Sequence, residues 1–343
     1  MRFAVYAISK NEIKHVKRFI DSCSGADSIV VLDTGSDDGT VEELRRLGAD
    51  VYEADINPWR FDTARNLALA KVPENIDYCI SLDIDERLVD GWRQYLESAI
   101  VPGNTHVLNW FIESHTSSKY WKFRIHARNG WGWRYRVHEE LYNHSSGSYA
   151  ISEATIVHEP DLTKSRSGYL PLIEQVLSDF PHNPRFLSYK AFELVALGEK
   201  DEAVDVLKLA IENAGSVIDS YEKSYYCITI ANLLGADGYE WLLRAIVYAP
   251  EWRDAWYQIG LHYYLGGRFA DAHEALERAI RLQSQQRNFQ SVGARSSELY
   301  SMAAKAAYKN GQTSRAKSIM SIGMKIFGDD AKFAKLYSKL LLK

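Results

Sequence analysis

Short apolar runs alternate with helical patterns along the first part of the chain. The run FAVYAI is followed by a helical pattern over about residues 12–22, and SIVVLD is followed by one over about residues 40–47. The alternation continues as far as YCISLDID. Parallel strands need a long crossover connection, which is usually a helix. The pattern therefore predicts an α/β fold with a Rossmann-like, mostly parallel sheet.

The composition changes over residues 105–160, where aromatic and β-branched residues are interrupted by short polar breaks. These residue types favour extended backbone. We expect extended segments here that complete or flank the sheet.

Beyond residue 165 the pattern becomes helical and repeats itself. A small residue recurs at Ala203, Ala272 and Ala316, with a glycine five residues before each and another small residue seven residues after each. The 69 residues from Ala203 to Ala272 leave room for one degenerate unit, which gives a period of about 34 residues. This is the period of the tetratricopeptide repeat, a helix–turn–helix unit.

The segment DAWYQIGLHYYLGGRFADAHEALERAI, residues 254–280, resembles the tetratricopeptide consensus in register. The longer step of 44 residues from Ala272 to Ala316 predicts an inserted loop around SQQRNFQSVG. We interpret the aromatic stripe of these helices as inter-helix core. A repeat array by itself indicates a binding or assembly module.

Composition places the chain among ordinary globular proteins. Its 343 residues, 46% of them hydrophobic and 25% charged, suffice for two domains with separate cores. We predict an α/β domain over residues 1–165 and an all-α repeat domain over residues 166–343. The formal net charge of −4 argues against a broad nucleic-acid-binding surface.

Three features predict a cytoplasmic protein without a membrane span. No apolar run approaches the roughly 20 residues that cross a bilayer. The first residues lack the pattern of a secretory signal. Cys23, Cys79 and Cys227 are odd in number and widely spaced, which favours buried thiols over disulfides or a zinc site.

The stretch IVVLDTGSDDGT places Asp33 at the end of an apolar strand, before a turn with two glycines. Open α/β sheets bind ligands at the carboxyl ends of their strands, where a carboxylate can accept from a nucleobase or a ribose. The alternative is a simple turn followed by a helix cap, since Ser and Asp are good caps. Spacing alone does not separate these two interpretations.

Asp83, Asp85 and Glu86 crowd the end of a second apolar run. Strand residues two apart point to the same side, so Asp83 and Asp85 can face one ligand. Two carboxylates so close repel one another unless a cation such as Mg²⁺ or Mn²⁺ offsets them. The alternative is a solvated strand end.

These motifs together resemble the family-2 glycosyltransferases of the GT-A fold, through IVVLDTGSDDGT, FDTARNLAL and YCISLDIDERL. The subfamily to which the chain is most similar carries tetratricopeptide repeats after its catalytic domain. The resemblance therefore covers nearly all of the chain. It implies that an Asp-x-Asp motif binds the diphosphate of a nucleotide sugar through a divalent metal.

The resemblance also implies residue roles in donor binding. Asp33 matches a position that contacts the nucleoside, and the backbone from Ala7 to Ser9 would line the base. Arg65 matches a basic residue near the base and the diphosphate, for which its paired donors are suited. Asp83 would face the ribose or the metal, and Asp85 would bind the metal directly.

The remaining implied roles belong to two His-Glu pairs. Glu139 lies where the family places the general base, with Glu140 as the alternative. His158 fits the place of a late histidine ligand to the metal, and His138 competes with it. Without the resemblance, a histidine in a β-rich segment is more often structural.

Trp131 and Trp133 alternate with Gly130 and Gly132 between the metal motif and the His-Glu pairs. Aromatic rings pack on the apolar faces of sugars, and glycines permit a loop that closes over the donor. His138 joins them as a candidate contact of the loop or the acceptor. The equally weighted alternative is a tight turn with core tryptophans.

The leading hypothesis is an inverting glycosyltransferase that uses Mn²⁺ or Mg²⁺ and a nucleotide sugar, in particular a UDP-sugar. The expected acceptor is a protein, a peptide or a glycan, and the repeats would bind that acceptor or form a homodimer. The rival hypothesis is a non-catalytic repeat scaffold with a degenerate transferase domain. Within enzymes, a nucleotidyltransferase or a retaining transferase is the alternative.

Overall fold

The computed structural model describes residues 1–116, 118–143, 147–161, 169–282, 293–328, 330, 331, 333–335 and 338. The chain divides into two compact units, Met1–Val176 and Leu177–Lys343. The domain boundary predicted at residues 165 and 166 lies outside the described residues, as does nearly all of the predicted loop around SQQRNFQSVG. Within the described part of the chain, no helix is long and apolar enough to cross a membrane.

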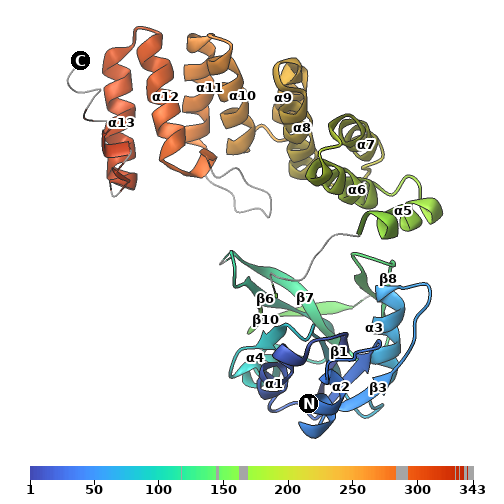
Figure 1. Ribbon diagram of the computed structural model, residues 1–343. Helices are drawn as coiled ribbons and strands as arrows, with labels where there is room; N and C mark the ends of the chain where they lie inside the picture. The colour runs from blue at the N-terminus through green and yellow to red at the C-terminus, as the bar shows by residue number, and fades with distance from the viewer. Residues whose placement is uncertain are drawn as a thin grey trace. The chain divides into compact units, whose positions relative to one another are not determined.

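A mixed sheet of eight strands forms the centre of the first unit (Figure 1). Its spatial order is β3 (Asp50–Glu53), β2 (Ser28–Asp33), β1 (Phe3–Ser9), β4 (Tyr78–Ser81), β7 (Ser118–Ala127), β6 (Asn104–Glu113), β10 (Ser148–His158) and β5 (Glu86–Leu88). A separate antiparallel ribbon consists of β8 (Trp131–Arg134) and β9 (Glu140–Asn143).

The two halves of the sheet differ in how their strands pair. Strands β3, β2, β1 and β4 run parallel, as the alternation of strands and helices predicts. Strand β7 is antiparallel to both β4 and β6, and β5 is antiparallel to β10. Strands β6 and β10 are parallel to each other and run in the same direction as the first half, so the sheet is mixed but mostly parallel, as predicted, with the antiparallel strands β7 and β5 as exceptions. For β7 the reason is connection length, because four residues join β6 to β7 and so short a link joins antiparallel strands.

Helices cover both faces of the parallel half. One face packs against α1 (Ile13–Ser22), α2 (Thr40–Arg46) and α4 (Trp92–Ala99), and the other packs against α3 (Phe61–Ala70) and β8. In β1, Phe3 and Val5 belong to the first core, whereas Ala4 and Tyr6 belong to the second. This alternation is the normal consequence of strand geometry. Because the apolar side chains pack on the two faces of the sheet, polar residues are found at the carboxyl ends of its strands.

The second unit consists of helix pairs (Figure 1). The pairs are α6 (Pro184–Leu197) with α7 (Lys200–Glu212), α8 (Ser220–Leu234) with α9 (Tyr239–Tyr248), α10 (Arg253–Leu265) with α11 (Phe269–Arg281), and α12 (Ser297–Lys309) with α13 (Thr313–Phe327). Helix α5 (Tyr169–Asp179) begins in the first unit and ends in the second. The predicted degenerate repeat is the pair α8–α9.

Close helix packing explains the small residues of the repeat pattern. Ala203, Ala272 and Ala316 are fully buried. A Cβ atom added to Gly260 of α10 would lie 2.6 Å from Cγ of Leu276 on α11, which is closer than two carbon atoms can approach. Glycine at this position therefore sets the spacing of the pair.

Candidate active site

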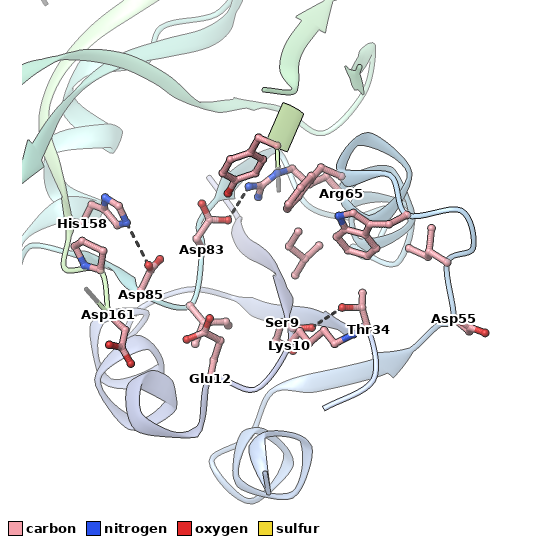
Figure 2. A pocket seen from close by; sticks show the side chains of 17 residues that line it. Ser9, Lys10, Glu12, Thr34, Asp55, Arg65, Asp83, Asp85, His158 and Asp161 are labelled. Atoms are coloured by element: carbon pink, nitrogen blue, oxygen red, sulfur yellow. Dashed lines mark hydrogen bonds and ion pairs between the residues drawn. The ribbon is translucent and has the colours of Figure 1, made fainter. Parts of the chain in front are cut away.

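A pocket of about 640 Å³ opens at the carboxyl ends of the parallel strands β1 to β4 (Figure 2). Its polar and charged lining consists of Ser9, Lys10, Glu12, Thr34, Asp55, Arg65, Asp83, Asp85, His158, Asp161 and Tyr169. Its apolar lining consists of Ile8, Ile56, Trp59, Phe61, Ile84 and Pro160. Ser9 thus lines the pocket as predicted, whereas Ala7 lies in the hydrophobic core.

Asp33 organises the loop that follows β2. One carboxylate oxygen accepts from the Ser9 hydroxyl at 2.7 Å, and the other accepts from the backbone N–H groups of Gly35 and Ser36 at 2.9 and 2.8 Å. Asp33 is 1% exposed and does not line the pocket, whereas its neighbour Thr34 does. The turn interpretation thus describes Asp33 in this structure, and its contact with a nucleoside stays a prediction.

Arg65 of α3 joins two of the predicted site residues. Its Nε donates to Glu139 Oε1 and its Nη2 donates to Asp83 Oδ1, both at 2.7 Å. The guanidinium also lies over the ring of Trp133, 5.0 Å from its centroid. Arg65 is 4% exposed, and its Nη1 is buried without a hydrogen-bond partner among the described residues. Buried donors are rarely left unpaired, so a ligand oxygen is a suitable partner for this atom.

A second arginine, Arg124 of β7, reaches the same carboxylate from the opposite side. Its Nη2 donates to Glu86 Oε1 at 2.8 Å and to Asp83 Oδ2 at 3.4 Å. Burial alone would raise the pKa of Asp83, but Arg65 and Arg124 outweigh it and hold this pKa well below its usual range. Asp83 therefore stays ionised at neutral pH without a cation bound to it.

Glu86 and Arg124 are the members of this network that the sequence did not assign. Glu86 is 2% exposed, and its Oε2 accepts the backbone N–H of Asp83 at 3.0 Å, so it shapes the loop after β4. Burial raises the pKa of Glu86. Only the pairing of β4 with β7 brings Arg124 to this loop, and nothing in the local pattern predicts that pairing.

Asp83 and Asp85 lie in the loop between β4 and β5, not within a strand as predicted, and they have different partners. Asp85 Oδ2 lies 3.2 Å from Nε2 of His158, the last residue of β10 (Figure 2). Burial alone would lower the pKa of His158, but Asp85 and Glu113 raise it to about 9. The positive charge of the protonated His158 ring thus balances the negative charge of Asp85 when no metal ion is bound.

The Asp85–His158 pair has a donor set that suits a divalent cation. A carboxylate oxygen and an imidazole nitrogen both bind Mn²⁺, and the 3.2 Å between them lets both reach one ion. Among the residues that the structure describes, no group of three or more His, Cys, Asp or Glu side chains is arranged to hold a metal ion. Asp85 and His158 would therefore share an ion with oxygen atoms of substrate or water, as is common for Mg²⁺.

The glutamates of the two His-Glu pairs have different surroundings. Glu159 pairs with Arg18 and with Arg87, the latter at 2.8 Å, and so anchors the end of β10 to α1 and β5. Glu140 pairs across the β8–β9 ribbon at 2.9 Å. Glu139 contacts the pocket-lining Arg65, so of the two candidates for the base it is the one connected to the pocket.

The glycine-flanked tryptophans belong to β8 and do not line the pocket. Trp133 is 6% exposed, and its Nε1 donates to the Tyr6 hydroxyl at 2.8 Å. Trp133 is thus a core residue in this structure and does not belong to a loop that could close over the donor. His138 also lies outside the pocket lining, but its ring centroid is 5.8 Å from that of Tyr169, which lines the pocket.

Comparison with known proteins finds a family match and curated relatives that each cover part of the chain. The tetratricopeptide repeat family matches residues 253–285, which confirms the predicted repeat in that segment. Over 221 residues, 59% of this chain, the sequence is 28% identical to the SPbeta prophage-derived glycosyltransferase SunS of Bacillus subtilis (strain 168). The glycosyltransferase SunS of Bacillus phage SPbeta matches to the same extent. The chain spans about half, 51%, of the length of these curated relatives.

Two solved structures match part of the chain at low identity and low TM-score. A crystal structure of MamA protein has a TM-score of 0.36 at 20% identity, covering 46% of this chain and 80% of that one. The C-terminal part of a TPR repeat-containing protein from Cytophaga hutchinsonii has a TM-score of 0.41 at 18% identity, covering 50% of this chain and 65% of that one.

Proposed function

We propose that this chain is a metal-dependent glycosyltransferase of the GT-A fold, similar to family 2, which moves a hexose-like unit from a nucleotide sugar to an acceptor. The similarity to a glycosyltransferase over 221 residues supports the class of reaction. A UDP-sugar as donor and inversion at the anomeric centre are part of the proposal. The proposed acceptor is a protein, a peptide or a glycan.

The observation that carries the proposal is the charge of the pocket. Five carboxylates line it, against three basic side chains; the acids are Glu12, Asp55, Asp83, Asp85 and Asp161, and the bases are Lys10, Arg65 and His158. A diphosphate is itself an anion, so this lining would repel it unless a divalent cation bound with it. Arg65 nevertheless lines the pocket, and its buried Nη1 has no hydrogen-bond partner among the described residues, so the guanidinium suits a phosphate oxygen.

Donor binding follows from these groups. Asp85 and His158 would hold Mn²⁺ or Mg²⁺, which supplies charge that stabilises the leaving diphosphate. Asp83 fixes the direction of the Arg65 guanidinium through a 2.7 Å contact, and Arg65 Nη1 donates to the diphosphate. Ser9 and Thr34 line the part of the pocket that we assign to the nucleoside.

Glu139 is the proposed general base. An inverting transfer needs a carboxylate that takes the proton from the acceptor nucleophile as it attacks the anomeric carbon. The contact between Arg65 and Glu139 holds this carboxylate beside the pocket. No covalent bond between enzyme and sugar is needed in this mechanism.

Thermal unfolding with nucleotide diphosphates tests the donor site. We expect UDP with Mn²⁺ to raise the Tm of the wild-type chain, by an amount that corresponds to about 2.7 kcal/mol at 100 times the Kd. UDP without the metal should act much more weakly, and Asp85→Asn should lose the metal-dependent part. A Tm that responds to no nucleotide diphosphate in the presence of Mn²⁺ or Mg²⁺ would refute the proposal, and a response to GDP alone would change the donor.

A partner-binding function is the second candidate, favoured by the repeat match at residues 253–285. Stacked helix pairs present extended surfaces that bind proteins and often pair with themselves. In the transferase proposal the same surface binds a protein acceptor or joins two copies of the chain. If donor hydrolysis with Mn²⁺ is absent in the wild-type chain and unchanged in Asp85→Ala, a scaffold is the better description.

A further inference from the structure

A carboxylate outside the pocket lining contacts the far side of the His158 ring. Glu113 is the last residue of β6, and its Oε2 lies 2.7 Å from His158 Nδ1. Its other oxygen, Oε1, accepts from the hydroxyl of Tyr120 on β7 at 2.9 Å. The next imidazole, that of His115, is 3.8 Å from Glu113 Oε2, which is too far for a hydrogen bond.

Backbone pairing fixes this contact. Glu113 and His158 are direct partners in the register of β6 with β10, and the backbone N–H of Ser114 donates to the carbonyl of His158 at 3.0 Å. The relative positions of the two side chains therefore follow from the sheet and not from a loop. Tyr120 holds the carboxylate from the neighbouring strand.

The chemistry of imidazole gives this contact a consequence. A histidine that binds a cation through one ring nitrogen keeps a proton on the other. Glu113 lies beside Nδ1, so it accepts a hydrogen bond from a proton on that nitrogen. The other nitrogen, Nε2, is then the one that is left to bind a cation, and it lies 3.2 Å from Asp85 Oδ2. A carboxylate in this place both orients the ring and makes the ligating nitrogen more basic.

We infer that Glu113 is a positioning residue, which with Tyr120 holds His158 in the tautomer and orientation that bind a divalent cation together with Asp85. The inference rests on the proposed function, since it concerns the same cation. It adds two residues that do not touch the pocket and that no local pattern in the sequence indicates.

The test is the affinity of the full chain for Mn²⁺ in the presence of UDP, measured from the electron paramagnetic resonance signal of free Mn²⁺. Glu113→Ala should weaken Mn²⁺ binding about 10- to 100-fold, the usual cost of losing such a partner. Glu113→Gln keeps an acceptor for Nδ1 and should restore most of the affinity. Tyr120→Phe, which removes only the hydroxyl, should give a smaller loss.

Glu153→Ala is the matched control, because it removes one negative charge from β10 at a glutamate whose Oε2 accepts from Trp110. It should bind Mn²⁺ as the wild type does. Each variant is measured below its Tm, so that a loss of stability does not register as a loss of affinity. If wild type binds Mn²⁺ and Glu113→Ala binds it equally well, Glu113 has only a structural role and the inference is overturned.

The same series separates the inference from the proposed function. If the wild-type chain itself binds no Mn²⁺ in the presence of UDP, the proposed metal site is refuted, and the inference about Glu113 is refuted with it. If Asp85→Asn abolishes binding while Glu113→Ala, Glu113→Gln and Tyr120→Phe all match wild type, the metal site stands and only the positioning role is lost. Should Glu113→Ala fail to fold, unchanged affinity in Tyr120→Phe overturns the inference.

Discussion

Arg65 contacts Asp83, Glu139 and Trp133 at once, whereas the resemblance in sequence implied only a basic residue near the base and the diphosphate. The structure explains why Lys would not replace it, since a single ammonium group cannot donate in two fixed directions and stack on a ring. Two partly buried carboxylates share this guanidinium, and of the two Asp83 also has Arg124 as a partner.

Replacing Arg65 by Ala should therefore destabilise the first unit strongly. Removing one member of a buried ion pair costs about 3–5 kcal/mol, because a carboxylate is left without its counter-charge. For a unit of this size that lowers the Tm by about 6–20 °C. The matched control is Arg45→Ala, whose pair with Glu53 has the same 2.7 Å length but is exposed on both sides. Its Tm should change by no more than about 4 °C. Equal Tm values for the two variants would contradict the network.

Lys122 of β7 gives the site a dependence of stability on pH. Burial, together with the nearby Arg124, lowers the pKa of Lys122 from 10.5 to about 8. Below pH 8 the ammonium is charged in both states, and the folded state bears the cost of burying it. Between pH 8 and 10.5 the unfolded chain binds more protons than the folded chain, so stability rises with pH. The full difference amounts to about 3 kcal/mol.

Lys122→Met removes this cost and should have a higher Tm than wild type at pH 7. The gap should narrow as the pH rises from 8 toward 10.5, because the wild-type amine is then neutral in the folded state and the folded chain no longer buries a charge. Lys119→Met, at an exposed lysine of the same strand, serves as the control for the loss of a lysine side chain. A constant gap for Lys122→Met would contradict the buried-ammonium interpretation.

Among the elements, the first half of the sheet and the helix pairs follow directly from local patterns. Strand β2 ends at Asp33 and α2 begins at Thr40, close to the predicted bounds. The loop after β4 is different, because periodicity predicted a strand through Asp85, whereas β4 ends at Ser81. Glu86, which accepts the backbone N–H of Asp83, draws the chain out of the strand there. This contact is local, between residues three apart, but a turn of this kind leaves no periodic signal.

The pair α10–α11 offers a test of the repeat spacing at Gly260. Gly260→Ala places a methyl group 2.6 Å from Leu276 Cγ, so the two helices must move apart or Leu276 must leave its rotamer. Overpacking of this kind costs about 1–3 kcal/mol. Gly266→Ala, at the end of the same helix, meets no atom closer than 3.5 Å and should be tolerated. Thermal melts followed by circular dichroism would compare them, and a Gly260→Ala variant as stable as Gly266→Ala would contradict the packing.

At the scale of the whole molecule, the chain consists of two compact units. The pocket and the network around it lie within the first unit, and the tetratricopeptide match lies within the second. The predicted homodimer through the repeats stays a prediction.

What the sequence determined by itself is the part of the molecule that depends on neighbours along the chain. Strand and helix periods gave the α/β unit and the repeats, and Ser9, Arg65, Asp83, Asp85 and His158 were identified as site residues and line one pocket. The tertiary structure decided how charge is shared within that pocket. It assigned Asp83 to two arginines, Asp85 to His158, and Asp33 to its own loop. These choices depend on strand pairings between residues far apart in sequence, such as β4 with β7 and β6 with β10, and local patterns carry no information about them.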